Sequence, residues 1–257
     1  MKLGICAGPG TWRQPPPGLD FIEANVQGLL KPQADEDAFA PQLAAAQSAP
    51  RPILAANCFL PGSLPCTGPN VNVEDLDSYV RTALCRAEKV GIRTIVFGSG
   101  GSRRVPDGFE HAEATRQLTD HLKRWGPMAA DHGVTLVVEP LQKRDCNIIT
   151  TVGEGADLVR RADHPSVRLL ADTFHMAADG DPPGSLDEAG ELIAHVHVAE
   201  LEGRTPPGVH GEDLRPYFRP LRQAGYDGAY SLECNWQNLD DQAAAALAEL
   251  RRQIEET

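Results

Sequence analysis

The sequence has few aromatic residues, and its basic residues are outnumbered by acidic ones. Phe, Trp and Tyr make up 5% of its 257 residues, and 24 Lys and Arg stand against 36 Asp and Glu, for a formal net charge of −12. Nucleic acids and anionic membranes select basic surfaces, so this balance argues against both as partners. An acidic surface could instead hold a divalent cation.

The sequence also lacks long hydrophobic runs and paired cysteines. No apolar run is long enough to cross a bilayer, and no basic segment followed by an apolar stretch stands at the N-terminus. The six cysteines form no CxxC pair and no dense framework, which is typical of reduced thiols. We therefore expect a cytoplasmic protein.

The glycine-rich stretch from Gly98 to Arg104 matches neither nucleotide-binding fingerprint, so ATP and NAD are not expected as cofactors. Its backbone N–H groups and arginines could cradle a phosphate. A tight turn after a strand explains the same residues.

Short apolar segments alternate with helical patterns along the whole chain, which predicts a parallel α/β architecture. The expected strands are residues 1–6, 19–23, 52–57, 92–97, 135–139, 169–172, 194–198 and 229–233. The expected helices are residues 37–46, 75–90, 110–132, 152–161, 185–192, 213–224 and 240–255. The length fits one (β/α)8 barrel, so we predict a single TIM-barrel domain over residues 1–257.

Four successive expected strands end in a side chain that can bind a metal. These are Glu139, Asp172, His197 and Glu233, separated by 33, 25 and 36 residues, about one strand and helix apiece. In a parallel barrel the carboxyl ends of the strands meet at one rim, where ligands bind. The repetition makes helix capping or ion pairing the poorer explanation and predicts a metal site.

Other residues near these ends are assigned less direct roles. Glu23, at the end of the second strand, could support the site residues or bind substrate, and a structural role is the default assignment. We place His195 on the opposite strand face from His197, as a structural residue. The candidates for an apolar wall around a ligand are Trp12, Phe59, Phe174 and Trp236, each of which core packing also explains.

Four motifs carry a family resemblance: Val138-Glu139-Pro140-Leu141, Asp172-Thr173-Phe174-His175-Met176, His195-Val196-His197-Val198-Ala199-Glu200 and Ser231-Leu232-Glu233. They resemble the xylose-isomerase-like TIM-barrel superfamily of sugar isomerases and epimerases, in particular its ketose 3-epimerase-like branch. The likeness covers nearly the whole chain and is most specific in the second half.

The resemblance implies roles for particular residues. It implies that one divalent cation is coordinated by Glu139, Asp172, His197 and Glu233, and that Glu139 and Glu233 also act as the acid–base pair. It further implies that His175 and Arg204 bind the substrate. Relatives commonly carry Leu-Asn-Arg and then a substrate-binding Glu, where this chain has Leu-Gln-Lys-Arg and then Asp145. We expect Asp145, one methylene shorter, to take the place of that Glu and to alter the sugar that is accepted.

The residue types indicate the chemistry. Carboxylates with one imidazole suit Mn²⁺ or Mg²⁺ best and also admit Co²⁺ or Zn²⁺. Such a cation, acting as a Lewis acid on a ketose, stabilises an enediolate. Two carboxylates on opposite faces of the sugar would invert one carbon, whereas one carboxylate moving a proton between adjacent carbons would interconvert aldose and ketose. The sequence leaves both outcomes open.

Other functions remain in competition. A hydroxypyruvate isomerase or a keto-inositol dehydratase would reuse the metal and the acid–base pair. An endonuclease IV-like nuclease shares an Asp-Thr-x-His element, but it needs more histidines at earlier strand ends, where this chain offers Asn57 and Gly98. A sugar-binding protein without activity is the third class, and a homo-oligomer is plausible for any of them.

Overall fold

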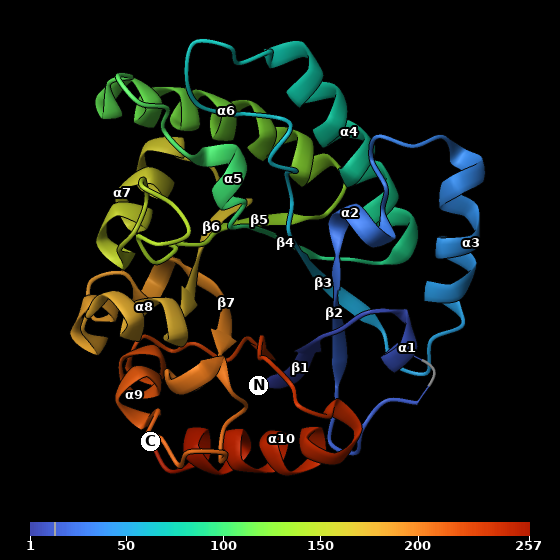
Figure 1. The fold of residues 1–257 in the computed structure, drawn as a ribbon, viewed down its shortest axis with the longest axis vertical. Helices are drawn as coiled ribbons and strands as arrows, with labels where there is room; N and C mark the ends of the chain where they lie inside the picture. Colours follow the sequence, from blue (N-terminus) through green and yellow to red (C-terminus); the bar gives the residue numbers. More distant parts are fainter. Residues whose placement is uncertain (13) are drawn as a thin grey trace.

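Eight parallel strands close into a barrel in the computed structural model, which describes residues 1–12 and 14–257, without the side chains of residues 11 and 12 (Figure 1). The strands are β1 (Lys2–Cys6), β2 (Phe21–Asn25), β3 (Ile53–Asn57), β4 (Thr94–Phe97), β5 (Thr135–Val138), β6 (Val167–Asp172), β7 (Ile193–Val198) and β8 (Ala229–Leu232). They pair in chain order, and β8 pairs back onto β1. The predicted (β/α)8 barrel is confirmed.

Helices surround the barrel on its outside (Figure 1). They are α1 (Pro9–Trp12), α2 (Val26–Leu29), α3 (Glu36–Gln47), α4 (Val73–Val90), α5 (Gly100–Arg103), α6 (His111–Asp131), α7 (Val152–Ala162), α8 (Thr173–Asp179), α9 (Arg215–Gln223) and α10 (Leu239–Glu255). Three short 3₁₀ helices are η1 (Pro183–Leu186), η2 (Gly190–Leu192) and η3 (Glu202–Arg204). None of the described helices is long and apolar enough to cross a membrane.

Local signals fix where the long helices begin and end. Helix α4 begins after Asn72, whose side chain accepts hydrogen bonds from the backbone N–H groups of Glu74 and Asp75. It ends at Gly91, whose φ of 96° is left-handed and therefore favours glycine. Helix α3 begins in the same way after Asp35. Both helices begin and end within two residues of the predicted bounds.

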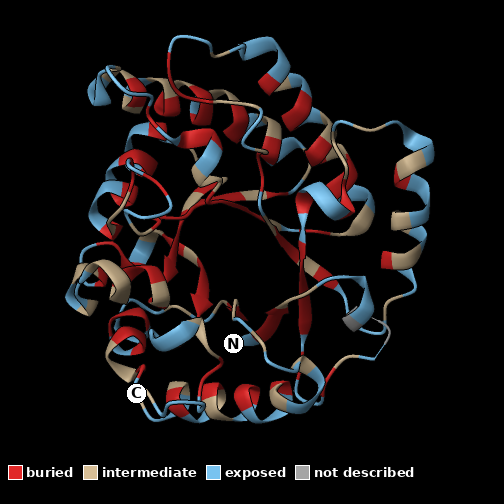
Figure 2. Ribbon diagram, viewed as in Figure 1, coloured by how far each residue is buried: buried red, intermediate tan, exposed pale blue. Residues whose placement is uncertain are grey.

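The main core fills the space between the strands and the inner faces of the helices (Figure 2). Phe59, Phe97 and Trp125 pack edge to face there, with ring centroids 5.8 to 6.0 Å apart. Core packing therefore accounts for Phe59, which was a candidate for a ligand wall. The same prediction for Trp12 falls outside the described side chains.

A second, smaller apolar cluster of Val96, Val137 and Leu170 lies apart from the main core. Residues two positions apart on a strand share a face, so Glu139 and Asp172 stand on the same faces as Val137 and Leu170. The apolar cluster therefore lies inside the barrel, and the carboxylates of Glu139 and Asp172 lie above it, at the carboxyl rim.

Two sequence predictions about the elements need correction. Residues 185–192 were expected to form one helix, but the chain forms η1 and η2 there: Pro182, Pro183 and Gly184 stand just before the segment, and Gly190 interrupts it. Helix α8 directly after Asp172 was not predicted. It is only seven residues long, too short for a helical period to be visible in the sequence.

Candidate metal and substrate site

The four strand-end groups meet at the carboxyl rim of the barrel. Each of Glu139, Asp172, His197 and Glu233 offers one ligand atom, and these four atoms lie within 4.8 Å of one another. The first three side chains are buried and Glu233 is partly exposed. The structure thus brings together all four residues that the sequence singled out.

His197 stands at the centre of this group. Its Nδ1 lies 3.1 Å from Glu139 Oε1, 3.2 Å from Glu233 Oε2 and 3.9 Å from Asp172 Oδ2. On the other side of the ring, Nε2 lies 2.8 Å from Glu23 Oε1. A carboxylate behind a histidine fixes the ring and directs its other nitrogen forward, as is common behind metal ligands. Nδ1 is therefore the atom that His197 offers to a cation.

Glu23 holds two histidines at once. Its Oε2 lies 2.7 Å from Nε2 of His195, and its Oε1 contacts His197. The prediction that His195 points away from His197 was wrong, because residues two apart on a strand share a face. The two rings lie 5.3 Å apart inside the barrel, and Glu23 is fully buried between them.

The charges of these buried groups depend on one another. Burial alone would raise the pKa of Glu23, but His197 and His195 beside it lower that pKa well below its usual value. Burial would lower the pKa of His197, but Glu23 and Glu233 raise it well above its usual value. For Glu233, burial is outweighed by His197 and Arg204, which lower its pKa to about 2. Glu23 and Glu233 are therefore ionised at neutral pH.

Asp172 uses its two oxygens differently. Oδ1 accepts hydrogen bonds from the backbone N–H groups of Phe174 and His175, at 2.8 and 3.1 Å, and so caps α8. Oδ2 faces the site, 3.3 Å from Nη2 of Arg204. One residue thereby begins a helix and contributes to the acidic cluster.

Two residues that follow β4, Gly98 and Arg103 of α5, shape the space around Glu139. A Cβ on Gly98 would stand 2.0 Å from Glu139 Oε2, so glycine leaves room for the carboxylate. Arg103 is fully buried and donates hydrogen bonds to the backbone oxygens of Phe97 and Glu139, each at 2.9 Å. The loop therefore positions Glu139 from behind, and Arg103 is not available to a phosphate.

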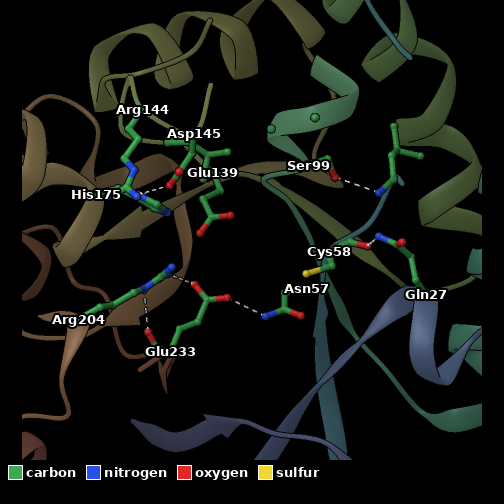
Figure 3. Close-up of a pocket in the computed structure, with 14 residues that line it drawn as sticks. Gln27, Asn57, Cys58, Ser99, Glu139, Arg144, Asp145, His175, Arg204 and Glu233 are labelled. Atoms are coloured by element: carbon green, nitrogen blue, oxygen red, sulfur yellow. Dashed lines mark hydrogen bonds and ion pairs between the residues drawn. The ribbon is translucent and has the colours of Figure 1, made fainter. Parts of the chain in front are cut away.

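Arg204 and Glu233 lie against each other at the open side of the cluster (Figure 3). The Nε of Arg204 also donates to the backbone oxygen of Glu233 at 3.0 Å, and its guanidinium lies 4.7 Å from the ring centroid of Phe174. Asn57 Nδ2 donates to Glu233 Oε1 at 2.8 Å from the opposite side. Phe174 thus supports Arg204.

The segment that carries Arg204 is organised by a residue the sequence analysis did not single out. Glu200 is fully buried, and its carboxylate accepts backbone N–H bonds of 2.7 to 3.1 Å from Gly208, His210, Gly211 and Glu212. Glu200 closes the motif that begins at His195, but the sequence spacing does not reveal that four backbone N–H groups further along the chain donate to its carboxylate.

A pocket of about 480 Å³ opens beside the cluster (Figure 3). Its lining includes Glu139, Glu233, His175, Arg204 and Asp145, so the three predicted substrate contacts all face it. His175 is buried, with its Nε2 3.8 Å from Asp172 Oδ2 and its Nδ1 4.0 Å from Asp145 Oδ2. The pocket is lined by polar groups of both signs, as a polyhydroxylated ligand requires.

The donor set fits a divalent cation. Three carboxylates and one imidazole, converging within 4.8 Å, are the ligands that Mn²⁺ and Mg²⁺ accept, and Co²⁺ and Zn²⁺ also tolerate them. A second group of Cys6, Glu23 and His197 lies deeper. Burial raises the pKa of the Cys6 thiol well above its usual value, so this group is the poorer cation site.

A closed parallel barrel with an acidic, histidine-containing cluster and a polar pocket at its carboxyl rim defines a metal-competent TIM-barrel protein. The chain belongs to the family described as xylose isomerase-like TIM barrel, whose model matches residues 18–254. The family resemblance read from the motifs is confirmed.

Proteins similar in sequence to this chain are named for several different enzyme activities. A D-psicose 3-epimerase of Agrobacterium fabrum is 31% identical over 180 residues, which cover 63% of this chain and 60% of the relative. A 3-dehydroshikimate dehydratase of Pseudomonas aeruginosa is 37% identical over 130 residues, covering 45% of this chain and 20% of the relative. The chain thus spans less than two thirds of the length of these relatives.

Solved structures show the same fold. The structure of a D-psicose 3-epimerase with D-tagatose from Clostridium cellulolyticum H10 has a TM-score of 0.82 at 19% identity, covering 99% of both chains.

Proposed function

We propose that this chain is a divalent-metal-dependent sugar isomerase or epimerase that acts on a ketose or a related keto-polyol by proton transfer through an enediolate. The observation that carries the proposal is the placement of Glu139 and Glu233. They directly follow β5 and β8, approach the same His197 nitrogen within 3.2 Å, and both line the pocket. Proton transfer beside a carbonyl needs such a pair of positioned carboxylates.

In this proposal, the four clustered side chains hold the cation, and two of them also transfer protons. A divalent cation, Mn²⁺ or Mg²⁺, held by Glu139, Asp172, His197 and Glu233 would supply Lewis acidity toward the substrate carbonyl. Glu233, ionised because its pKa is lowered to about 2, accepts a proton from the substrate carbon. In this step Glu139 starts with its carboxyl group protonated and delivers that proton from the other side, so the two carboxyl groups exchange protonation states in one turnover. Inversion of one carbon results when the two carboxylates act on opposite faces of the sugar.

The pocket residues orient the substrate. Arg204 is held by Glu233, Asp172 and Phe174, so its remaining N–H donors are presented to a sugar oxygen with little loss of freedom. His175 and Asp145, which lie on the same side of the pocket as Arg204, offer further hydrogen bonds (Figure 3). The names of the relatives, among them D-psicose 3-epimerase and L-ribulose 3-epimerase, support ketoses as the substrate class.

A dehydratase is the second candidate, because a 3-dehydroshikimate dehydratase is 37% identical over 130 residues. Its first step would be the same, since a proton beside a carbonyl must leave. The two functions differ only in the second step, which is either return of the proton or loss of a neighbouring hydroxyl group. A nuclease is disfavoured, because the metal-binding groups found among the described residues contain one histidine between them.

The test is solvent exchange in deuterated water. Metal-stripped protein with and without Mn²⁺ is incubated with a panel of ketoses, ketose phosphates and hydroxypyruvate, and the label is followed by NMR. We expect Mn²⁺-dependent label at one carbon together with the epimer or isomer of one panel member. Release of water from a labelled substrate would favour the dehydratase, and no exchange with any member would overturn the isomerase assignment for these sugars.

Glutamine variants test the roles of the Glu139 and Glu233 carboxylates one at a time. Glu139→Gln and Glu233→Gln keep the size of the side chain and remove the proton donor and the proton acceptor, respectively, so each should lower turnover by about 10² to 10⁴-fold. Glu202→Gln, an exposed residue beyond the pocket, makes the same chemical change and should leave turnover intact. Full activity of Glu233→Gln would contradict the assigned acid–base pair.

A further inference from the structure

The far wall of the rim pocket carries an amide group that contacts the acidic cluster. Asn57 is the last residue of β3, and its Nδ2 donates a hydrogen bond of 2.8 Å to Glu233 Oε1, 176 residues further along the chain (Figure 3). In the barrel, β1 and β2 stand between β3 and β8, so the bond joins the ends of strands that are not neighbours. Both residues line the pocket.

The charge of Glu233 decides which end of the Asn57 amide faces it. A carboxylate that binds a metal must be deprotonated, so the oxygens of Glu233 only accept hydrogen bonds. The amide nitrogen therefore faces Oε1, because the reverse orientation would set two oxygens against each other. An aspartate at this position would lack the donor and would repel Glu233, whereas the amide donates without adding a charge.

The second oxygen of Glu233 faces the cluster. Oε2 lies 3.2 Å from His197 Nδ1, the nitrogen offered to a cation, and also contacts Arg204. A carboxylate turns easily about the bond that joins it to the side chain, because this torsion has broad minima. A donor on Oε1 opposes that rotation and keeps Oε2 turned toward the other ligands. The Glu233 side chain is 23% exposed, against 7% or less for the other three, so it has the least enclosure of its own.

We propose that Asn57 is a positioning residue that holds the Glu233 carboxylate in the orientation in which it binds the cation. Groups behind metal ligands commonly orient them in this way, and Glu23 stands behind His197 in the same manner. The catalytic part of the proposal rests on the function proposed for the rim, where Glu233 also accepts the substrate proton. The effect on the cation needs no turnover.

A double-mutant cycle on Mn²⁺ affinity tests the contact. Asn57→Leu removes the donor at similar volume, and Glu233→Ala removes the carboxylate. The Kd of Mn²⁺ is measured by EPR on metal-stripped full-length protein for the wild type, both single variants and the double variant. Asn57→Leu should weaken binding about tenfold in the wild type and less than twofold beside Glu233→Ala, because a residue that acts through Glu233 then has nothing to act on. No loss in the wild type, or equal losses in both backgrounds, would overturn the proposal.

Gln27→Leu is the matched control. Gln27 lines the same pocket, but its amide donates to the backbone oxygen of Cys58, at 2.9 Å, and not to a carboxylate (Figure 3). This variant should leave the Kd of Mn²⁺ within twofold of the wild type. A loss as large as that of Asn57→Leu would show that any apolar substitution on this wall disturbs the cluster, and would refute the specific contact. Asn57→Ala repeats the cycle with a smaller side chain, so that a folding defect of Asn57→Leu does not decide the result.

Turnover separates this proposal from the function of the rim. With a sugar of the panel that exchanges deuterium, Asn57→Leu should lower kcat at least tenfold and change KM less than threefold, because the proton acceptor is misplaced while the pocket stays open. A rise in KM with unchanged kcat would show that Asn57 only binds substrate and would overturn the positioning role. Failure of every panel sugar in the wild-type protein would count against the proposed function alone, and the Mn²⁺ cycle would still decide the role of Asn57.

Discussion

At the scale of single residues, Asp172 combines a helix cap with a place in the acidic cluster. Its Oδ1 caps α8 and its Oδ2 faces the cluster, so the two roles rest on different atoms. Asparagine can keep the capping oxygen while it replaces the other oxygen with an amide. Alanine removes both.

This division predicts different results for the two substitutions. Asp172→Asn should weaken Mn²⁺ binding by about 100-fold or more while the stability of the metal-free protein changes little. Asp172→Ala should weaken binding equally and also cost about 1 kcal/mol of stability through the lost cap. Urea unfolding and Mn²⁺ titration by EPR measure the two effects. Equal losses of stability in both variants would show that the cap is not a separate role.

His121 illustrates a buried histidine whose neighbours keep it neutral. Its Nε2 donates to the backbone oxygen of Cys66 at 3.0 Å, Nδ1 lies 2.6 Å from an Arg124 guanidinium nitrogen, and the ring stacks on Trp125. Burial, followed by the charge of Arg124, lowers its pKa to about 4. The folded protein therefore resists protonation of a ring that titrates near 6.5 when unfolded.

This pKa difference predicts a pH-dependent stability. The contribution is complete above pH 6.5 and is lost as the pH falls toward 4, because the unfolded state binds the proton first. Between pH 7.5 and 5 the loss should be about 2 kcal/mol, and His121→Gln should lack this part of the dependence. Urea unfolding of both proteins across this range gives the difference. Parallel curves for the two would contradict the buried neutral ring.

At the scale of elements, the connection from β7 to α9 is organised by one buried carboxylate. Glu200 follows β7 and binds backbone N–H groups of residues 208–212, while Arg204 lies between on η3. The segment has little helix or strand of its own. Its order therefore depends on an acceptor that satisfies several donors at once.

We expect Glu200→Gln to loosen this segment without unfolding the barrel. A carboxamide turns one acceptor oxygen into a donor, so several N–H groups lose their partner at a cost of about 1–3 kcal/mol. Hydrogen exchange of residues 201–214 should become at least tenfold faster, and turnover should fall because Arg204 moves. Glu202→Gln, in the same segment but exposed, is the control. Unchanged exchange in Glu200→Gln would contradict this role.

At the scale of the whole molecule, the proposed cation would cross-link four strands. Its ligands come from β5 to β8, and each of these strands pairs with the next. Anything that binds the folded state and not the unfolded one stabilises the fold by mass action. The metal should therefore act on stability as well as on activity.

A thermal scan tests this linkage. Mn²⁺ at about a thousandfold excess over its Kd should add about 4 kcal/mol and raise Tm by about 8 °C or more, and EDTA should reverse the shift. Asp172→Asn should show little of the rise. An equal rise in both proteins would place the stabilising metal elsewhere.

The sequence predicted the barrel and the four clustered side chains because both arise from local patterns. Strand ends are visible in hydrophobicity, and the closed topology then brings these ends to one rim. What could not be predicted depends on contacts between distant residues. Glu23 meets His195 across 172 positions, and Gly98 leaves room for Glu139 from a neighbouring strand. The error over His195 was of a different kind, since strand periodicity alone places it beside His197.

The residues around the pocket come from two different halves of the barrel. The clustered groups come from the β5–β8 half, whereas the far wall of the pocket, with Gln27, Cys58 and Leu60, comes after β2 and β3. Substitutions or insertions in the early connections can therefore change what fits the pocket while the clustered side chains stay in place. Under the proposed function, natural divergence and directed evolution could then exchange substrates without altering the metal site.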